Sequence, residues 1–234
     1  MNGKPSFSEK DADYYNRFME GYSPYSDRDL EMMLKPLDDM VLRFDRPRIC
    51  EIGSASGQFS QHLARRYGKE RLTLYGLDIA AGVLAVYPYH RICGSAFALP
   101  IRDEAVDMVC LPAALHHLFP LEASLPELSR ILKKGGILYC LEPNLHHPQR
   151  FFFMRFQAMY NLYRNTNDVP VHAGALKNVL KSYGMSVAGF QYVSLEFAKP
   201  SILQKIQNRL ASIVRRESLK KYTLPWFILM ARKG

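Results

Sequence analysis

The stretch formed by residues 48–59 constrains the fold of this chain more than any other. It reads RICEIGSASGQF: a short apolar run contains the acidic Glu51, two glycines follow at Gly53 and Gly57, and a helical pattern then begins. Glycine lets the backbone approach a ligand closely, and a helix start offers N–H groups and the positive end of the helix dipole. We therefore predict a strand, a tight turn and a helix that hold a polar, partly anionic small molecule.

Apolar runs and helical patterns alternate along much of the rest of the chain. The pattern predicts strands at 48–52, 72–77, 89–93, 106–111, 137–141, 185–192 and 224–231, and helices at 57–67, 80–87, 121–132 and 173–183, with a helix stop at 133–136. Strands that are nearly continuous in apolar residues belong to sheets covered on both faces. The sequence thus predicts an α/β fold: a Rossmann-like, doubly wound, seven-stranded, mostly parallel sheet with helices on both faces.

The length of 234 residues fits one domain. Within 1–234 we predict an N-terminal helical arm (1–44), a ligand-binding core (45–144), an aromatic cover (145–172) and a C-terminal half (173–234) that contains an inserted basic amphipathic helix at 200–218. In the arm, Ser26 or Asp27 can cap a helix that Pro36 breaks or kinks.

Composition argues against several classes of protein. No stretch approaches the ~20 apolar residues that span a bilayer, and the first residues are polar, so we expect a cytoplasmic location. The four cysteines sit in or beside apolar runs without the short spacing of a zinc or redox motif, which predicts buried, reduced thiols.

Positive charge is concentrated near the end of the chain. The net charge is +9, and nine Lys or Arg between residues 195 and 234 face only Glu196 and Glu217. Three interpretations of the basic helix at 200–218 stay open: it packs on the body with solvated charges, makes peripheral contact with an anionic membrane, or meets an anionic acceptor. No RNA-binding module is visible, so a nucleic-acid substrate is the weaker option.

The residues around Gly57 discriminate among ligands. A phosphate-binding loop for a nucleoside triphosphate needs a lysine after its last glycine, and here Gln58 follows. A dinucleotide fingerprint needs glycines where Ala55 and Gln58 stand. Both ligand classes are therefore disfavoured.

Five segments in order resemble the motifs of the class I S-adenosylmethionine (SAM)-dependent methyltransferases. The resemblance covers about residues 45–192, and its segments are Glu51-x-Gly53-x-x-x-Gly57, Asp78, Gly94-Ser95-Ala96-x-x-Leu99-Pro100, Asp107-x-Val109 with Leu115-His116-His117-Leu118, and Glu127-Leu128-x-Arg130-x-Leu132-Lys133-x-Gly135-Gly136. Each motif alone is weak, but five at the right spacing are a strong signal.

The resemblance implies SAM as cofactor and a set of residues that bind it: Glu51, Gly53, Ser54, Ala55, Gly57, Asp78, Ile79, Ser95, Ala96 and Leu111. In that family the carboxylate corresponding to Asp78 accepts hydrogen bonds from the two ribose hydroxyls, which suits its two acceptor oxygens. Glu51 is expected to hold the turn or the cofactor's ammonium group, and N–H groups near Gly53 and Ala55 to approach the methionine part. Ser95 departs from the family's aspartate, so its bond to adenine should be weaker.

The sequence says less about the methyl acceptor than about the cofactor. His117 and His116 are candidate general bases, or they only shape the turn after strand 106–111. We expect the two rings to point apart, and no metal site is expected. The aromatic residues between 151 and 163 favour a small, hydrophobic or lipid-like acceptor. The leading function is SAM-dependent methylation of such a metabolite. The alternatives are an RNA or protein methyltransferase using the basic C-terminal region, or a catalytically inactive partner subunit with the same fold.

Overall fold

The computed structural model describes residues 25–148, 169, 171–195, 209 and 217–234. Three sequence predictions therefore fall largely or wholly outside the described residues: the first part of the N-terminal arm, the aromatic cover at 149–168, and most of the basic helix at 200–218.

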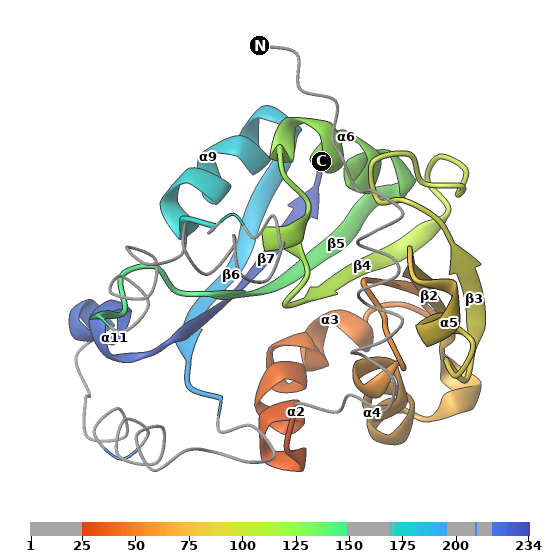
Figure 1. The fold of residues 1–234 in the computed structure, drawn as a ribbon, viewed down its shortest axis with the longest axis horizontal. Helices are drawn as coiled ribbons and strands as arrows, with labels where there is room; N and C mark the ends of the chain where they lie inside the picture. Colours follow the sequence, from red (N-terminus) through yellow and green to blue (C-terminus); the bar gives the residue numbers. More distant parts are fainter. Residues whose placement is uncertain (1–24, 149–168, 170, 196–208, 210–216) are drawn as a thin grey trace.

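Seven strands form one sheet in the order β3-β2-β1-β4-β5-β7-β6 (Figure 1). Strands β1 to β5 pair in parallel, and β7 pairs antiparallel with both β5 and β6. The strands are β1 (Arg48–Ile52), β2 (Thr73–Asp78), β3 (His90–Cys93), β4 (Val106–Pro112), β5 (Leu132–Pro143), β6 (Met185–Val193) and β7 (Trp226–Lys233). The prediction of a seven-stranded, mostly parallel sheet is confirmed.

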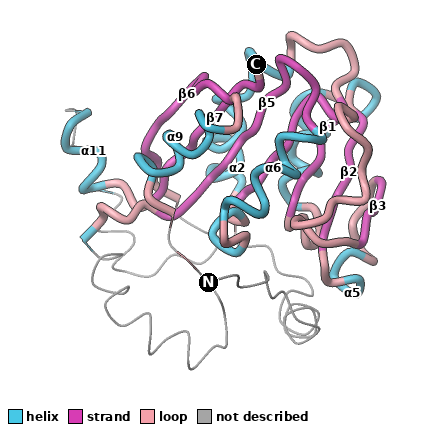
Figure 2. Tube along the Cα trace, turned by 90° about the horizontal axis from the view of Figure 1, so that it is seen from above, coloured by secondary structure: helices cyan, strands magenta, loops and turns pink. Residues whose placement is uncertain are grey.

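Helices cover both faces of this sheet, as Figure 2 shows from above. Helices α2 (Asp27–Leu34), α3 (Asp38–Val41) and α4 (Gln58–Tyr67) pack on one face, and α6 (Leu121–Ile131) and α9 (Ala173–Ser182) on the other. Alternate strand residues serve the two cores: in β1, Ile49 faces the α2 and α4 side, while Cys50 and Ile52 belong to the other core. None of the helices in the described ranges is long and apolar enough to cross a membrane.

Three elements differ from the predicted pattern. The expected helix stop at 133–136 lies within β5, because pairing begins at Leu132 with Val106 and resumes at Ile137 with Met108, around a bend at Gly135 with φ of 75°. The sequence pattern left most of the residues between 217 and 223 outside any helix or strand, but they form a short helix, α11 (Glu217–Thr223). Helix α5 (Ala81–Leu84) is shorter than predicted.

The structure of the first described residues agrees with the sequence predictions for the N-terminal helix. Ser26 caps α2, and its hydroxyl accepts from the N–H of Asp29 while the Asp29 carboxylate accepts from the Ser26 N–H at 2.9 Å. Pro36 lies in the 3₁₀ turn Lys35–Leu37 that separates α2 from α3. The predicted cap and break are both confirmed.

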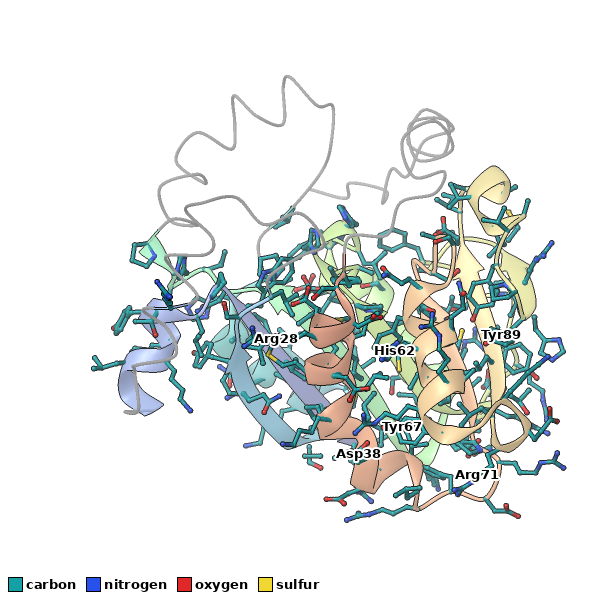
Figure 3. The ribbon with its side chains drawn as sticks, turned by 90° about the horizontal axis from the view of Figure 1, so that it is seen from below. Arg28, Asp38, His62, Tyr67, Arg71 and Tyr89 are labelled. Atoms are coloured by element: carbon teal, nitrogen blue, oxygen red, sulfur yellow. The ribbon has the colours of Figure 1, made fainter. Side chains whose placement is uncertain are left out.

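Ion pairs hold α2 and α3 against α4. Figure 3 labels Asp38, His62 and Tyr67 in this region. Arg66 donates to both carboxylate oxygens of Asp38 at 2.7 Å and also pairs with Glu31. Tyr67 donates its hydroxyl to Asp38 at 2.7 Å, and these bonds, with that of Arg66 the largest, lower the Asp38 pKa. The helix that follows the glycine turn is thereby held against the N-terminal helices.

The cysteine prediction is right for three residues and wrong for one. All four thiols are free; Cys50, Cys110 and Cys140 are buried, but Cys93 is exposed. The reason is topological, because Cys93 lies on β3, the edge strand of the sheet.

Candidate functional site

The carboxyl ends of β1, β2, β4 and β5 bring most of the predicted site residues to one edge of the sheet, where doubly wound folds bind ligands. The turn from Gly53 to Gly57 follows β1, Asp78 ends β2, and the 3₁₀ turn Leu115–His117 follows β4. The turns after β1 and β4 are in close contact, because a Cβ on Gly53 would lie 3.0 Å from the Cβ of Ala114.

The N–H groups of the glycine turn are engaged within the protein. Those of Gly53 and Ser54 donate to the Leu77 carbonyl at 2.8 and 3.1 Å, and that of Ala55 donates to the Asp78 carboxylate at 2.9 Å. This differs from the expectation that N–H groups near Gly53 and Ala55 approach a methionine moiety. The turn is bound to the end of β2 instead.

Unusual backbone conformations gather at this edge. Gly53 and Gly57 have φ of 68° and 80°, and two alanines, Ala55 after β1 and Ala113 after β4, also have positive φ, at 43° and 57°. Left-handed backbone is uncommon for alanine, and such strain tends to collect at functional sites. The strained alanines support this edge as the candidate site.

A buried hydrogen-bonded network lies beneath the turn. Tyr87 donates to the Ser60 hydroxyl at 2.8 Å, and Ser60 donates both its hydroxyl and, at 3.2 Å, its N–H to the Glu51 carboxyl group. Burial raises the pKa of Glu51 to about 8. Of the two roles expected for Glu51, holding the turn is the one that these contacts fit.

Tyr87, which the sequence did not single out, explains why two positions are glycine. A Cβ on Gly57 would lie 2.5 Å from Tyr87 Cδ2, and a Cβ on Gly76 of β2 would lie 2.5 Å from Tyr87 Cε2 and 2.7 Å from Ser54 Oγ. The Ser54 side chain is buried toward β2, and its hydroxyl has no hydrogen-bond partner in the described part of the chain. Gly57 is therefore needed for packing, whatever the ligand.

Asp78 is held at both carboxylate oxygens. Oδ2 accepts from the Ala55 N–H and Oδ1 from the Ala80 N–H, each at 2.9 Å. Burial raises the Asp78 pKa, and the nearby charge of His117 acts in the opposite direction. Each carboxylate oxygen has a second lone pair, so Asp78 can still accept from a vicinal diol. Ile79 follows it in the loop, partly buried.

The loop after β3 is held by α6. Ser95 Oγ accepts from the Phe97 N–H at 3.2 Å. Glu127 accepts from the Leu99 N–H at 2.7 Å, while Arg130 donates to the Leu99 carbonyl at 3.0 Å. The motif residues Glu127 and Arg130 thus position this loop. Two further predicted site residues, Ala96 and Leu111, are buried in the core beneath the edge.

A histidine and a buried glutamate form a pair that the sequence did not reveal. His116 Nδ1 lies 2.7 Å from Glu142 Oε2, and Glu142 Oε1 accepts from the Leu115 N–H at 2.7 Å. Glu142 lies near the end of β5 and is fully buried. An acidic residue late in an apolar strand, the signal that drew attention to Glu51, could have identified it.

The prediction that the adjacent histidine rings point apart is wrong. The ring centroids of His116 and His117 are 4.0 Å apart, because the bond to Glu142 fixes the His116 ring within the tight turn. Among the described residues there is no group of three or more His, Cys, Asp or Glu arranged to hold a metal ion.

Gln58, which distinguishes this turn from a phosphate-binding loop, has a structural partner. Its side-chain amide donates to the Tyr25 carbonyl at 2.9 Å and accepts from the Tyr25 N–H at 3.5 Å. The chain that enters α2 is therefore attached to the first residue of α4, beside the site.

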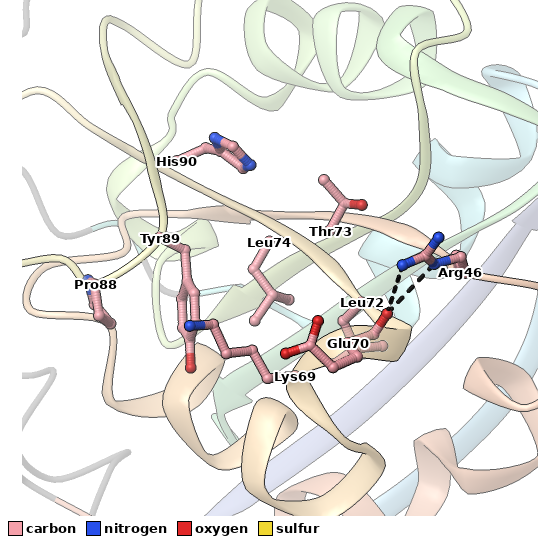
Figure 4. A pocket seen from close by; sticks show the side chains of 9 residues that line it. All are labelled: Arg46, Lys69, Glu70, Leu72, Thr73, Leu74, Pro88, Tyr89 and His90. Carbon is pink, nitrogen blue, oxygen red and sulfur yellow. Dashed lines mark hydrogen bonds between the residues drawn. The ribbon is translucent and has the colours of Figure 1, made fainter.

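A separate hollow of about 420 Å³ lies at the opposite end of the strands (Figure 4). It is lined at the amino ends of β2 and β3 by residues that include Thr73 and His90, and at its edge Arg46 donates to the Glu70 carbonyl at 3.2 and 3.3 Å. Ligands of doubly wound sheets bind at the carboxyl ends, so this hollow is distinct from the candidate site.

Comparison with known proteins agrees with the fold. Residues 50–140 match the methyltransferase domain family. The biotin biosynthesis bifunctional protein BioHC of Cellvibrio japonicus is 33% identical over 109 residues, which are 44% of this chain and 21% of that protein. Malonyl-(acyl-carrier protein) O-methyltransferase 1 of Coxiella burnetii is 30% identical over 108 residues, 46% of this chain and 37% of that protein. The chain spans well under half the length of these relatives.

A solved structure shows the same fold over nearly the whole chain. Phosphoethanolamine N-methyltransferase 2 of Haemonchus contortus, solved with phosphomonomethylethanolamine and S-adenosylhomocysteine, superposes with a TM-score of 0.64 at 15% identity, over 97% of this chain and 58% of that one. Residues 50–140 therefore match a methyltransferase domain, and the chain shares the fold of this solved methyltransferase.

Substitution of Gly57 tests the packing role of Tyr87. Gly57→Ala combines a positive φ with a Cβ 2.5 Å from Tyr87, whereas Gly68→Ala combines a φ of 91° with open space. We expect Gly68→Ala to lower the free energy of unfolding by about 1 kcal/mol, and Gly57→Ala by about 2–4 kcal/mol, since overpacking adds to the backbone strain. Urea unfolding measures both, and equal losses would contradict the packing account.

Glu51→Gln tests the buried carboxyl group. The folded-state pKa of about 8 lies above the ordinary value of 4.5, so between these values the folded protein retains a proton that the unfolded chain has released. The stability contributed by Glu51 is therefore present below pH 4.5 and is lost as the pH rises through 8. The unfolding free energy of the wild type minus that of the variant should fall with pH, by up to about 1.4 kcal/mol per unit. Parallel stability curves between pH 5 and 8 would show that Glu51 is ionised.

Proposed function

We propose that this protein transfers a methyl group from SAM to a small-molecule acceptor. The observation that carries the proposal is the contact between Asp78 and the glycine turn at the carboxyl ends of β1 and β2, inside a matched methyltransferase domain. A relative named malonyl-(acyl-carrier protein) O-methyltransferase supports an acceptor of this kind. A hydrophobic or lipid-like acceptor remains part of the proposal.

The residues present fit the cofactor. When bound, SAM would supply an electrophilic methyl group on its sulfonium. Asp78 would accept from the ribose hydroxyls with its remaining lone pairs, and Gly53, which is exposed at the edge, leaves space above the turn. Ser95 would meet the adenine, with its hydroxyl already accepting from Phe97. Glu51 and Gly57 would act from beneath, by holding the turn.

We assign the role of general base to His116. Its Nδ1 faces the Glu142 carboxylate at 2.7 Å, so Nδ1 is the protonated nitrogen and Nε2 carries the lone pair. Nε2 can then take a proton from an acceptor hydroxyl or acidic carbon as the methyl group is transferred. His117, whose ring lies against that of His116, would contribute charge near Asp78.

The alternatives make different demands. An RNA or protein methyltransferase would use the basic residues near the end of the chain, and its binding to RNA would weaken steeply with salt. A catalytically inactive subunit would bind SAM without turnover on a broad acceptor panel and would copurify with a partner. Ser95, in place of the family's aspartate, is the feature that keeps this alternative open.

Cofactor binding is the first test of the proposed function. Calorimetric titration should detect SAM binding and no NAD binding. Asp78→Asn should weaken SAM binding about 10- to 100-fold through lost charge-assisted hydrogen bonds, whereas Asp39→Asn, a change at an exposed carboxylate, should leave it unchanged. Thermal unfolding checks that both variants are folded. Binding of NAD without SAM would refute the proposal.

The base is tested by Glu142→Gln. The amide would keep an acceptor for the Leu115 N–H but would donate to His116 Nδ1, which moves the ring proton to Nε2 and removes the base. We expect S-adenosylhomocysteine formation to fall at least about 100-fold with unchanged SAM affinity. Nitrogen NMR of the histidine should show the tautomer change. Full activity with the changed tautomer would exclude His116 as the base.

A further inference from the structure

Five side chains form a second cluster at the rim of the same edge. We call His146, His172, Tyr192, Lys221 and Tyr222 the rim cluster. The ring centroids of His146 and His172 are 4.8 Å apart, and those of His146 and Tyr222 are 6.2 Å apart. Lys221 Nζ lies 4.6 Å from the centre of the Tyr222 ring. Tyr192 is near both residues: burial raises its pKa, and the charge of Lys221 acts in the opposite direction. The members come from the segment after β5, the start of α9, the end of β6 and α11.

A buried asparagine fixes the rim cluster to the sheet. The side-chain amide of Asn144 donates to the carbonyls of Lys221 and Leu224, each at 2.7 Å, and its Oδ1 accepts from the His146 N–H at 3.1 Å. Figure 1 shows β5 running toward α11, which these bonds hold at its end. Lys221 and Tyr222 are therefore positioned beside His146.

The rim cluster adjoins the turn that carries His116. The Val169 N–H donates to the His116 carbonyl at 3.0 Å, and Val171 is buried in the same core cluster as Leu115. His172 follows Val171 directly. His172 is only three residues from Val169, so the rim cluster lies near the proposed base His116 at the carboxyl ends of the strands.

The rim cluster contains the Lys221 ammonium, two histidines and two tyrosines. In the described ranges, no ion pair joins His146, His172 or Lys221 to a carboxylate. Burial lowers the His146 pKa, and the positive charges of His172 and Lys221 lower it further. A Lys ammonium and two phenolic hydroxyls offer several donors, and Tyr222 is 47% exposed, so solvent reaches the cluster.

We propose that the rim cluster binds the anionic group of the acceptor, a carboxylate or a phosphate. This rests on the proposed function in that the bound molecule is the methyl acceptor. An anion here would pair with the Lys221 ammonium, accept hydrogen bonds from the neighbouring histidine and tyrosine side chains, and be held beside the His116 turn. The acceptor would then be a small molecule with an acidic group in addition to any apolar part.

Anion binding can be measured without turnover. The full chain with ¹³C-labelled histidine would be titrated at constant ionic strength with inorganic phosphate and, separately, with acetate. The signals of His146 and His172 are assigned by their loss in the variants His146→Gln and His172→Gln. In the wild type, both signals should shift, and the shifts should saturate, with at least one of the two anions. His90, which is exposed on β3 and stacks on Tyr75 at 5.0 Å, should not shift. The better-bound anion identifies the acidic group.

Lys221→Gln and Lys220→Gln form a matched pair on α11. Loss of the Lys221 charge should weaken anion binding about tenfold, the change expected for one charge-assisted hydrogen bond, while Lys220→Gln should have little effect. Shifts of equal size at His90, no saturation, or equal weakening by both variants would overturn the anion site. Saturable binding in a protein that does not bind SAM would instead refute the proposed function and leave the anion site in place.

Discussion

The hydrogen bonds from Tyr87 to Ser60 and from Ser60 to Glu51 are the interaction on which the candidate site depends. They join the end of β1, the first turn of α4 and the chain before β3, and the Tyr87 ring occupies the space left by Gly57 and Gly76. An unpaired carboxyl group at this depth would be costly, so the network and the turn stabilise each other. The conformation of the glycine turn is therefore determined by this packing, whether or not a ligand is bound.

The two ends of the sheet have different roles. At the carboxyl ends, Asp78 and Glu142 use both carboxylate oxygens to fix neighbouring turns, which presents the edge and His116 in defined positions. At the amino ends, Asp107 accepts from the Arg48 N–H at 2.8 Å and from Lys133 at 2.6 Å, so this motif residue joins strands rather than facing a ligand. At least one carboxylate of the motifs therefore has a structural role in this chain.

The sequence predicted the sheet, a helix cap at Ser26 or Asp27 and a break or kink at Pro36, because local apolar periodicity and turn chemistry determine them. It did not predict that Cys93 is exposed, since edge position depends on strand order. It also missed the pairing of Glu142 with His116 and the rim cluster. The contacts of His116 with Glu142 and of His146 with His172 each join residues 26 positions apart, so no local pattern indicates them.

We infer that a methyl donor binds at the carboxyl ends of β1 and β2, with its ribose held by Asp78. A crystal structure with S-adenosylhomocysteine tests it most directly. The account predicts that the ribose hydroxyls lie within hydrogen-bond distance of the Asp78 carboxylate, above Gly53, with the sulfur facing the His116 turn. Density for the nucleoside in the hollow beside Arg46 and Lys69, or at this edge without contact to Asp78, would contradict it.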